Sequence, residues 1–149
     1  MTTTTAAAAR RVTRSTVVDA TPQQVFDLLA DPRNHPVIDG SGAVRDVLDA
    51  PVRLCLGAEF TMRMKAGASY TTRNTVIVFE PDREIAWKHR ARHTWHWSLW
   101  PVLGGTEVTE TFDWTAKRAP RLVTAIGIPR TAGASIDATL EKVRLHFSQ

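Results

Sequence analysis

The sequence has a single cysteine, Cys55, so no disulfide can form within the chain. Such sparse cysteine usage is typical of a reducing compartment, and we expect a cytoplasmic protein in which Cys55 is buried and inert. No stretch reaches the roughly 18 consecutive apolar residues of a membrane span, so none is predicted. Residues 1–10 are mainly threonine and alanine and lack the charged-then-apolar order of a secretory signal. We expect them to form a disordered tail before one domain at 11–149.

The chain also lacks runs of basic residues, although its formal net charge is +4. Its arginines and lysines are scattered, as expected for outward strand positions and turns, so the charge favours solubility over nucleic-acid binding. The polar loop Asp39–Gly42 has neither the lysine nor the strand-loop-helix frame of a phosphate-binding loop. No Ser-His-Asp or Cys-His arrangement suggests a nucleophile. The sequence therefore gives no motif of an enzyme that uses a phosphate-binding loop or a serine or cysteine nucleophile.

Alternating apolar and polar residues predict strands over most of the chain. Thr21 and Pro22 are typical of a helix start and Asp31–Pro32 of a helix end. A short helix is expected between them, with a second helical turn at 33–39 and an irregular segment at 120–129. A glycine pair at 104–105 indicates a hairpin. The predicted strands are 11–19, 43–54 with a break near Pro51, 58–66, 69–80, 84–90, 93–103 and 106–116.

From about residue 131 the apolar spacing becomes helical, through Ile136, Leu140, Val143 and Phe147. This pattern predicts a long C-terminal helix over 131–147. Strands joined by short turns pair antiparallel, and a twisted sheet of seven needs a cover for its apolar face. The predicted fold class is therefore α+β, a curved antiparallel sheet of seven strands around the C-terminal helix, with two short helices between the first and second strands. The gap between sheet and helix is the expected ligand site.

Three segments resemble a known superfamily: DATPQQVFDLLADPRNHPVIDGSG at 19–42, NTVIVFEPDREIAWKH at 74–89 and GGTEVTETFDW at 104–114. With the order of elements, they resemble the START-like (SRPBCC) helix-grip superfamily and, within it, bacterial polyketide cyclase/dehydrase-like proteins. The resemblance covers about 11–149. It implies the helix-grip fold and a cavity that binds or transforms a hydrophobic small molecule. It implies no catalytic residue, because the superfamily shares a cavity rather than a catalytic motif.

Strand parity sends one carboxylate toward the concave face of the predicted sheet. Pairing across the turn at 90–92 sets Trp87 opposite Trp95 and Ile85 opposite Trp97, all facing inward. The same parity turns Glu110 inward on the following strand. A buried carboxylate needs a partner, and the candidates on neighbouring strands are His89, Asn74 and Tyr70. Glu110 and His89 could form a general acid/base pair, anchor a ligand, or belong to a structural network inside the cavity; alternatively, Glu110 reaches water at the rim.

The wall of the expected ligand site is rich in aromatic residues that could stack a flat ligand or simply fill a core. The predicted ligand-binding residues are Tyr70, Asn74, Trp87, Trp95, Trp97, Phe112, Trp114, Met62, Met64, Ile136 and Leu140. Trp100 has the opposite parity and is expected to face outward. His89 and His93 share a face but His96 points away, which makes a poor zinc site, so no metal is predicted.

Three functions are compatible with this pattern. The leading hypothesis is binding of a hydrophobic or aromatic small molecule between the sheet and the C-terminal helix, with no cofactor. The second is a cyclase, aromatase or dehydratase that acts on a polyketide-like substrate through Glu110 and His89. The third is a protein-interaction domain, with a homodimer as one form.

Overall fold

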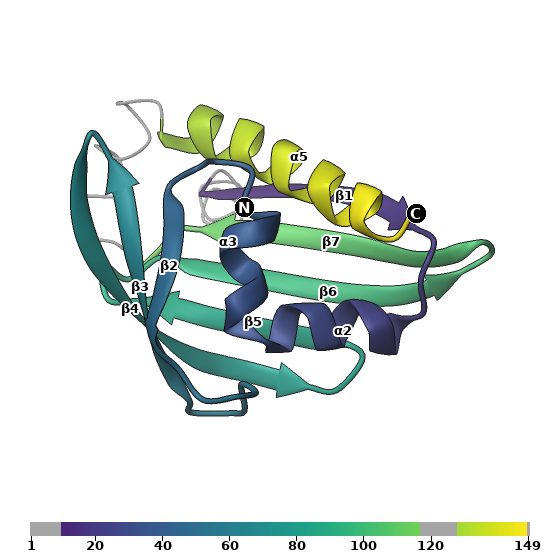
Figure 1. Ribbon diagram of the computed structural model, residues 1–149. Coiled ribbons are helices and arrows are strands. Elements are labelled where there is room, and N and C mark those ends of the chain that lie inside the picture. The colour runs from purple at the N-terminus through teal and green to yellow at the C-terminus, as the bar shows by residue number, and fades with distance from the viewer. Residues whose placement is uncertain (1–9, 117–127, 149) are drawn as a thin grey trace, which may run out of the picture.

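The computed structural model describes residues 10–116 and 128–148, and its helices lie on one face of a single curved sheet (Figure 1). The seven strands are antiparallel, in the order β1-β7-β6-β5-β4-β3-β2. They are β1 Arg11–Val18, β2 Val44–Asp49, β3 Glu59–Ala66, β4 Ala68–Glu80, β5 Glu84–His89, β6 Thr94–Val102 and β7 Gly105–Asp113. The helices are α2 Pro22–Ala30, the 3-10 turn η1 Pro32–Asn34, α3 His35–Ile38 and α5 Ile128–His146. The predicted helix-grip architecture is confirmed.

The start of α2 follows from local chemistry. Thr21 caps the helix: its hydroxyl accepts from the Gln24 amide at 3.2 Å, and its own amide donates to the Gln24 side chain at 2.9 Å. This reciprocal capping box satisfies two amides that have no partner within the helix. Pro22 needs no amide partner at the first position, and Pro32 ends the helical path. The segment therefore turns back over the sheet where the sequence predicted.

Helix α5 closes the sheet by packing along β1 and β7, while α2 lies over β5 and β6. The predicted apolar stripe of α5, with Ile136, Leu140 and Val143, is buried against the sheet. The short helix α3 lies between the two and contacts both α5 and β2. The concave face of the sheet is thus covered by three helices, and the core lies between them and the strands.

The loop after α3 is fastened to α5 by two hydrogen bonds. The Gly40 amide donates to the Thr139 hydroxyl at 2.8 Å, and the Lys142 ammonium donates to the Asp39 carbonyl at 3.0 Å. A Cβ on Gly40 would lie 2.4 Å from the Thr139 backbone nitrogen, closer than non-bonded atoms approach. The glycine is required because the loop and helix backbones nearly touch.

Helix α5 begins at Ile128, about three residues earlier than predicted, so Pro129 belongs to its first turn rather than to an irregular segment. Proline is tolerated there because the first amides of a helix have no intrahelical acceptor. The predicted tail at 1–9 and the part of the irregular segment at 120–127 lie outside the described residues.

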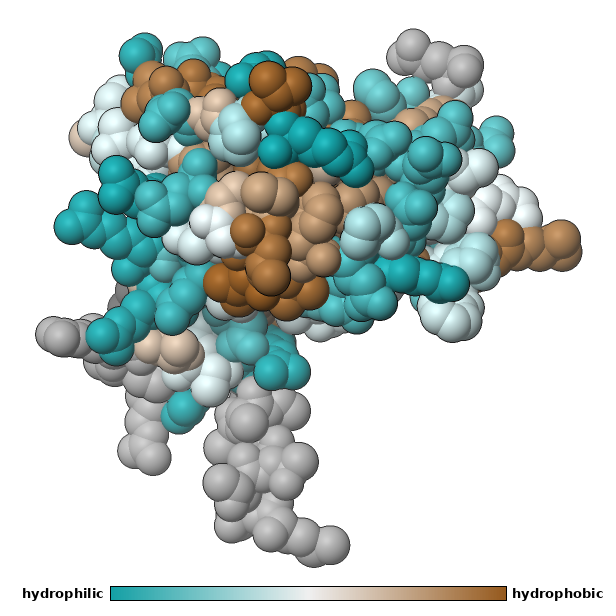
Figure 2. All heavy atoms as spheres, turned by 90° about the horizontal axis from the view of Figure 1, so that it is seen from below, coloured by the Kyte–Doolittle hydropathy of each residue, from teal (hydrophilic) through white to brown (hydrophobic). Residues whose placement is uncertain are grey.

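The second predicted strand was too long, and the expected burial of Cys55 was wrong. Strand β2 ends at Asp49, and the chain continues as a loop to β3. In that loop Leu54 is buried, tied by its amide to the Ala30 carbonyl at 2.8 Å, whereas Cys55 is exposed. Seen from below, this side of the molecule gathers apolar side chains in its middle (Figure 2), and the loop's exposed apolar residues are Val52 and Leu56.

The outer face of the sheet is polar along β1 and β7. Hydroxyl pairs join Thr13 to Thr111 at 3.0 Å and Ser15 to Thr109 at 2.8 Å. As predicted, Trp100 faces this side; it is 61% exposed, with the Arg83 guanidinium 4.9 Å from its ring. Within the described residues, no helix has both the length and the apolar character to cross a membrane.

Candidate functional site

Two rows of side chains cross β5, β6 and β7 on the concave face. The direct cross-strand partners in the first row are Ile85, Trp97 and Glu110. Those in the second row, nearer the β5–β6 turn, are Trp87, Trp95 and Phe112. The predicted pairings of β5 with β6 are confirmed, and Glu110 faces inward as the parity of its strand indicated. The site is therefore a wall of indole and apolar side chains that contains one carboxyl group.

Glu110 is a buried acid, only 5% exposed. Its Oε2 atom has no hydrogen-bond partner among the described residues. Burial raises the pKa of this carboxyl well above its ordinary value of 4.5, and the negative charge of Asp39 raises it further. Asp39 follows α3 and belongs to the loop that is fastened to α5. The carboxyl keeps its proton to higher pH than an exposed glutamate does.

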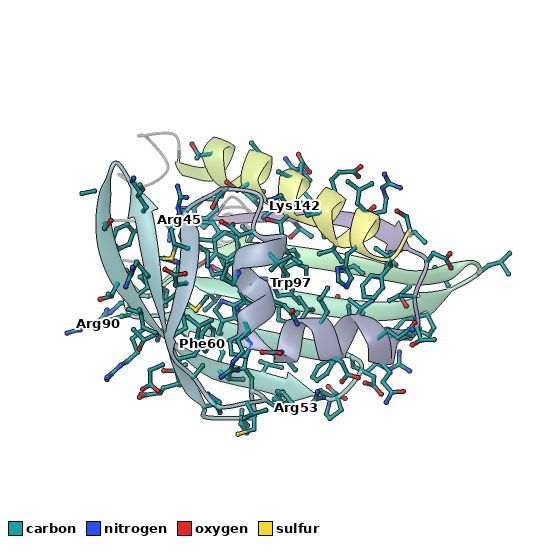
Figure 3. All side chains as sticks on the ribbon, viewed as in Figure 1. Arg45, Arg53, Phe60, Arg90, Trp97 and Lys142 are labelled. Atoms are coloured by element: carbon teal, nitrogen blue, oxygen red, sulfur yellow. The ribbon has the colours of Figure 1, made fainter. Side chains whose placement is uncertain are left out.

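Trp97 lies directly opposite Glu110 and is 2% exposed. Its Nε1–H group also has no hydrogen-bond partner among the described residues. Figure 3 shows Trp97 beneath the helix layer, with Phe60 also on the inner side of the sheet and Arg90 projecting away from the body of the molecule. A donor and an acidic group thus lie on adjacent strands, both buried and neither bonded to the other.

His35 is a buried residue of this region that the sequence analysis did not single out. Its Nε2 donates to the Leu29 carbonyl at 2.8 Å, and its ring stacks on Trp87 with centroids 4.7 Å apart. Phe60 meets the His35 ring edge-on at 5.5 Å. Burial lowers the pKa of His35 below 6.5, against the opposing effect of the Leu29 carbonyl. Through this hydrogen bond and ring stacking, His35 holds α3 over the second row.

The register does not bring the predicted acid–base pair together. His89 is four residues beyond Ile85 on β5, about 13 Å along the strand from the row of Glu110 at roughly 3.3 Å per residue. It pairs with Asn74 and stacks on His93 with centroids 4.3 Å apart, and its Nδ1 accepts from the Ala91 amide at 2.8 Å. His89 is thus part of the β5–β6 turn rather than a partner of Glu110.

The other predicted polar partners also lie away from Glu110. Asn74 is buried beside Phe60 and His89, on the far side of β5 from β7. Tyr70 shares its face of β4 but is 46% exposed and lies opposite Met64 near the end of the strand. Neither side chain forms a hydrogen bond with Glu110.

The remaining predicted ligand-binding residues divide by exposure. Buried ones include Met62 on β3, Trp114 just after β7, and Ile136 and Leu140 on α5. The less covered ones belong to the end of the concave face that leads to the β3–β4 and β5–β6 turns. There Met64 and Trp95 are half-buried and Tyr70 is exposed; the neighbouring His93, which was not a predicted ligand-binding residue, is also half-buried. The concave face is therefore most accessible from that end.

Two surface pockets, of about 410 and 490 Å³, lie elsewhere. They are bounded by threonine and basic side chains around Arg73 and the β5–β6 turn, including Arg90. Neither is lined by the tryptophans of the concave face, so neither is the predicted ligand space, which stays a prediction. Across residues 10–116 and 128–148, no group of three or more histidine, cysteine or acidic residues is arranged to hold a metal ion.

A sheet that grips one long helix, with aromatic side chains and a buried carboxyl on its inner face, defines a helix-grip protein. The chain belongs to the family described as polyketide cyclase / dehydrase and lipid transport, whose family model matches residues 9–147.

A relative matches most of the chain, and solved structures share its fold. The uncharacterized protein Rv0088 of Mycobacterium tuberculosis is 38% identical over 147 residues, a match that covers 93% of this chain and 65% of the relative. The chain thus spans about two thirds of the length of that relative. The crystal structure of Ms6760 from Mycobacterium smegmatis has a TM-score of 0.70 at 17% identity, covering 94% of both chains. The di-domain ARO/CYC StfQ of the steffimycin biosynthetic pathway has a TM-score of 0.69 at 14% identity, covering 97% of this chain and 53% of that chain.

Proposed function

We propose that this chain binds an apolar small molecule against the concave face, between the sheet and α5, with Glu110 as a polar contact. One observation carries the proposal: the Glu110 carboxyl is buried beside Trp97 and has an oxygen with no hydrogen-bond partner among the described residues. An unpaired buried polar atom costs about 1–3 kcal/mol. A bound molecule that completes the hydrogen bond offsets this cost, which gives a reason for an acid in an otherwise apolar wall.

The distribution of exposure supports a route to this carboxyl. Trp95 is half-buried, whereas Trp97 one pleat further along β6 is buried. A flat molecule that enters from the β5–β6 turn meets the Trp95 and Phe112 rings first and Glu110 last. The family description, which joins cyclases, dehydrases and lipid transport, is consistent with an apolar ligand.

A second function, catalysis of a cyclase, aromatase or dehydratase type, is favoured by one feature of the same residue. The raised pKa of Glu110 keeps the carboxyl protonated to higher pH, as a general acid requires. In this mechanism Glu110 acts without His89, because the register separates the two residues. The ARO/CYC StfQ protein shares the fold, which supports the class of reaction only by analogy.

The first experiment is native mass spectrometry of freshly purified protein, to detect a co-purifying small molecule. The second is a titration with N-phenyl-1-naphthylamine, an uncharged apolar dye that fluoresces in apolar surroundings. We expect saturable binding to the wild type. Trp97→Arg places a charge on the concave face and should abolish binding, whereas Trp100→Arg, the matched change on the outer face, should leave binding within about two-fold.

Leu140→Trp provides a second variant if Trp97→Arg does not fold, because it adds bulk from α5 without adding charge. Far-UV circular dichroism and a cooperative thermal transition confirm that each variant is folded. Equal dye binding by wild type, Leu140→Trp and folded Trp97→Arg, or no saturable binding by the wild type, would contradict the proposed function.

A further inference from the structure

Trp97 and Glu110 present complementary chemistry at one point of the concave face. They are direct partners across β6 and β7, and side chains of directly paired residues start about 5 Å apart. The indole Nε1–H can only donate a hydrogen bond, whereas the Glu110 Oε2 can accept one. Both atoms are buried without a partner among the described residues. If they bonded to one another, neither would remain unsatisfied.

We propose that Trp97 and Glu110 together recognise a single uncharged hydroxyl group, phenolic or alcoholic, on the apolar ligand. The hydroxyl oxygen accepts from the Trp97 Nε1–H, and the hydroxyl proton is donated to the Glu110 Oε2. This inference rests on the proposed function, because it assumes a ligand on the concave face. Beyond the proposed function, it specifies the chemical group of the ligand that Trp97 and Glu110 recognise.

A hydroxyl fits better than the alternative oxygen groups. A ketone or ether accepts from Trp97 but has no proton to donate, so the unprotonated Oε2 of the Glu110 carboxyl stays without a partner. A carboxylate brings a negative charge into a buried site near Asp39, whose own charge already acts on Glu110. Like charges at a buried site repel strongly, because the surroundings screen them little. Fatty-acid anions and other carboxylates are therefore rejected.

Four naphthalenes of matched shape test this selection by calorimetric titration at pH 7. They are 2-naphthol, which donates and accepts; 2-methoxynaphthalene, which only accepts; 2-methylnaphthalene, which does neither; and 2-naphthoate, which is charged. The wild type should bind 2-naphthol about 10-fold more tightly than 2-methylnaphthalene, as two ordinary hydrogen bonds allow. The ether should fall between them, and the carboxylate should bind most weakly.

Trp97→Phe keeps an aromatic ring but removes the donor. In this variant the ether should bind no more tightly than 2-methylnaphthalene, and the preference for 2-naphthol over 2-methylnaphthalene should fall at least three-fold. The affinity for 2-methylnaphthalene itself should change by less than about two-fold. Glu110→Leu should abolish the advantage of 2-naphthol over the ether. Trp100→Phe, on the outer face, should change none of these ratios.

Nuclear magnetic resonance of the indole N–H groups extends the test to the wild-type protein, so that it does not depend on a folded variant. The chain has five tryptophans. The Trp97 indole proton should move downfield with 2-naphthol but not with 2-methylnaphthalene. If 2-methylnaphthalene binds as tightly as 2-naphthol, the hydroxyl inference is wrong while the proposed function stands. If none of the four compounds binds, both fail.

Discussion

The Gly40 amide donates a hydrogen bond of 2.8 Å to the hydroxyl of Thr139, and this contact ties the loop after α3 to the middle of α5. The same loop carries Asp39, whose charge acts on Glu110. The closure of α5 over the sheet and the electrostatics of the buried acid are therefore coupled through one short segment.

Gly40→Ala should destabilise the protein by about 1–3 kcal/mol, because the new Cβ overlaps the backbone of α5 at Thr139. Gly133→Ala is the matched control within α5. There the nearest atom to a new Cβ is the mobile end of the Arg14 side chain at 3.2 Å, so the better helix propensity of alanine should stabilise by up to about 1 kcal/mol. Urea unfolding measures both variants; equal effects would contradict the close approach.

Glu110→Gln should change how stability depends on pH. Because the pKa of Glu110 is raised in the folded state, the folded chain holds the proton more tightly than the unfolded chain does. Wild-type stability should therefore decline as the pH rises from about 4.5 toward the folded pKa, by about 1.4 kcal/mol for each pH unit in that interval. A glutamine side chain does not titrate, so the variant should gain stability relative to the wild type between pH 5 and 8. A constant difference in unfolding free energy would show that Glu110 is not desolvated.

His35→Phe should keep the stacking on Trp87 but leave the Leu29 carbonyl without its donor, at a cost of about 1–3 kcal/mol at pH 8. The pKa of His35 is lowered by burial, so the unfolded chain takes up a proton first and the wild type should lose stability as the pH falls below 6.5. The His35→Phe variant should lack this part of the loss of stability at low pH. Unfolding curves at pH 8 and pH 5.5 distinguish the two, and an unchanged pH dependence would contradict the burial of the ring.

Cys55 should react with a thiol reagent such as dithionitrobenzoate in the native protein, because its side chain is exposed on the loop between β2 and β3. The reaction should go to completion without denaturant, and Cys55→Ser should give no signal. The serine variant should unfold within about 0.5 kcal/mol of the wild type, as is usual for an exposed position. Reaction only in urea would restore the expectation of a buried thiol.

The sequence predicted which face of the sheet each side chain occupies and how β5 pairs with β6, but not how β6 pairs with β7. The period of two turned Glu110 and Trp97 inward, as observed. The glycine pair at 104–105 suggested a turn there, but Gly105 pairs with Val102 and the turn lies one residue earlier. The earlier turn moves the β7 partner of every β6 residue by two positions, so each side chain stays on the same face of the sheet. It therefore sets Glu110 opposite Trp97 without any change in the parity on which the prediction rested.

His35 and Cys55 show where sequence patterns carry too little information. The helix that holds His35 has four residues, too few for an apolar period to emerge, and its buried contact is with a carbonyl of the preceding helix. Cys55 alternates with apolar neighbours as a strand residue would. Whether such a segment continues a strand or leaves the sheet is decided by Leu54 docking at the end of α2.

Strand β1 pairs with β7, so Val18 lies opposite Thr106 although most of the chain separates the two residues in sequence. During synthesis β1 must wait for the last strand before its backbone amides and carbonyls on that side find partners, and for α5 before its inner face is covered. Contacts so distant in sequence favour slow folding and prolonged exposure of an unpaired strand. A nascent chain interrupted before β7 would present an open sheet edge, and such intermediates are the ones on which we expect chaperones to act.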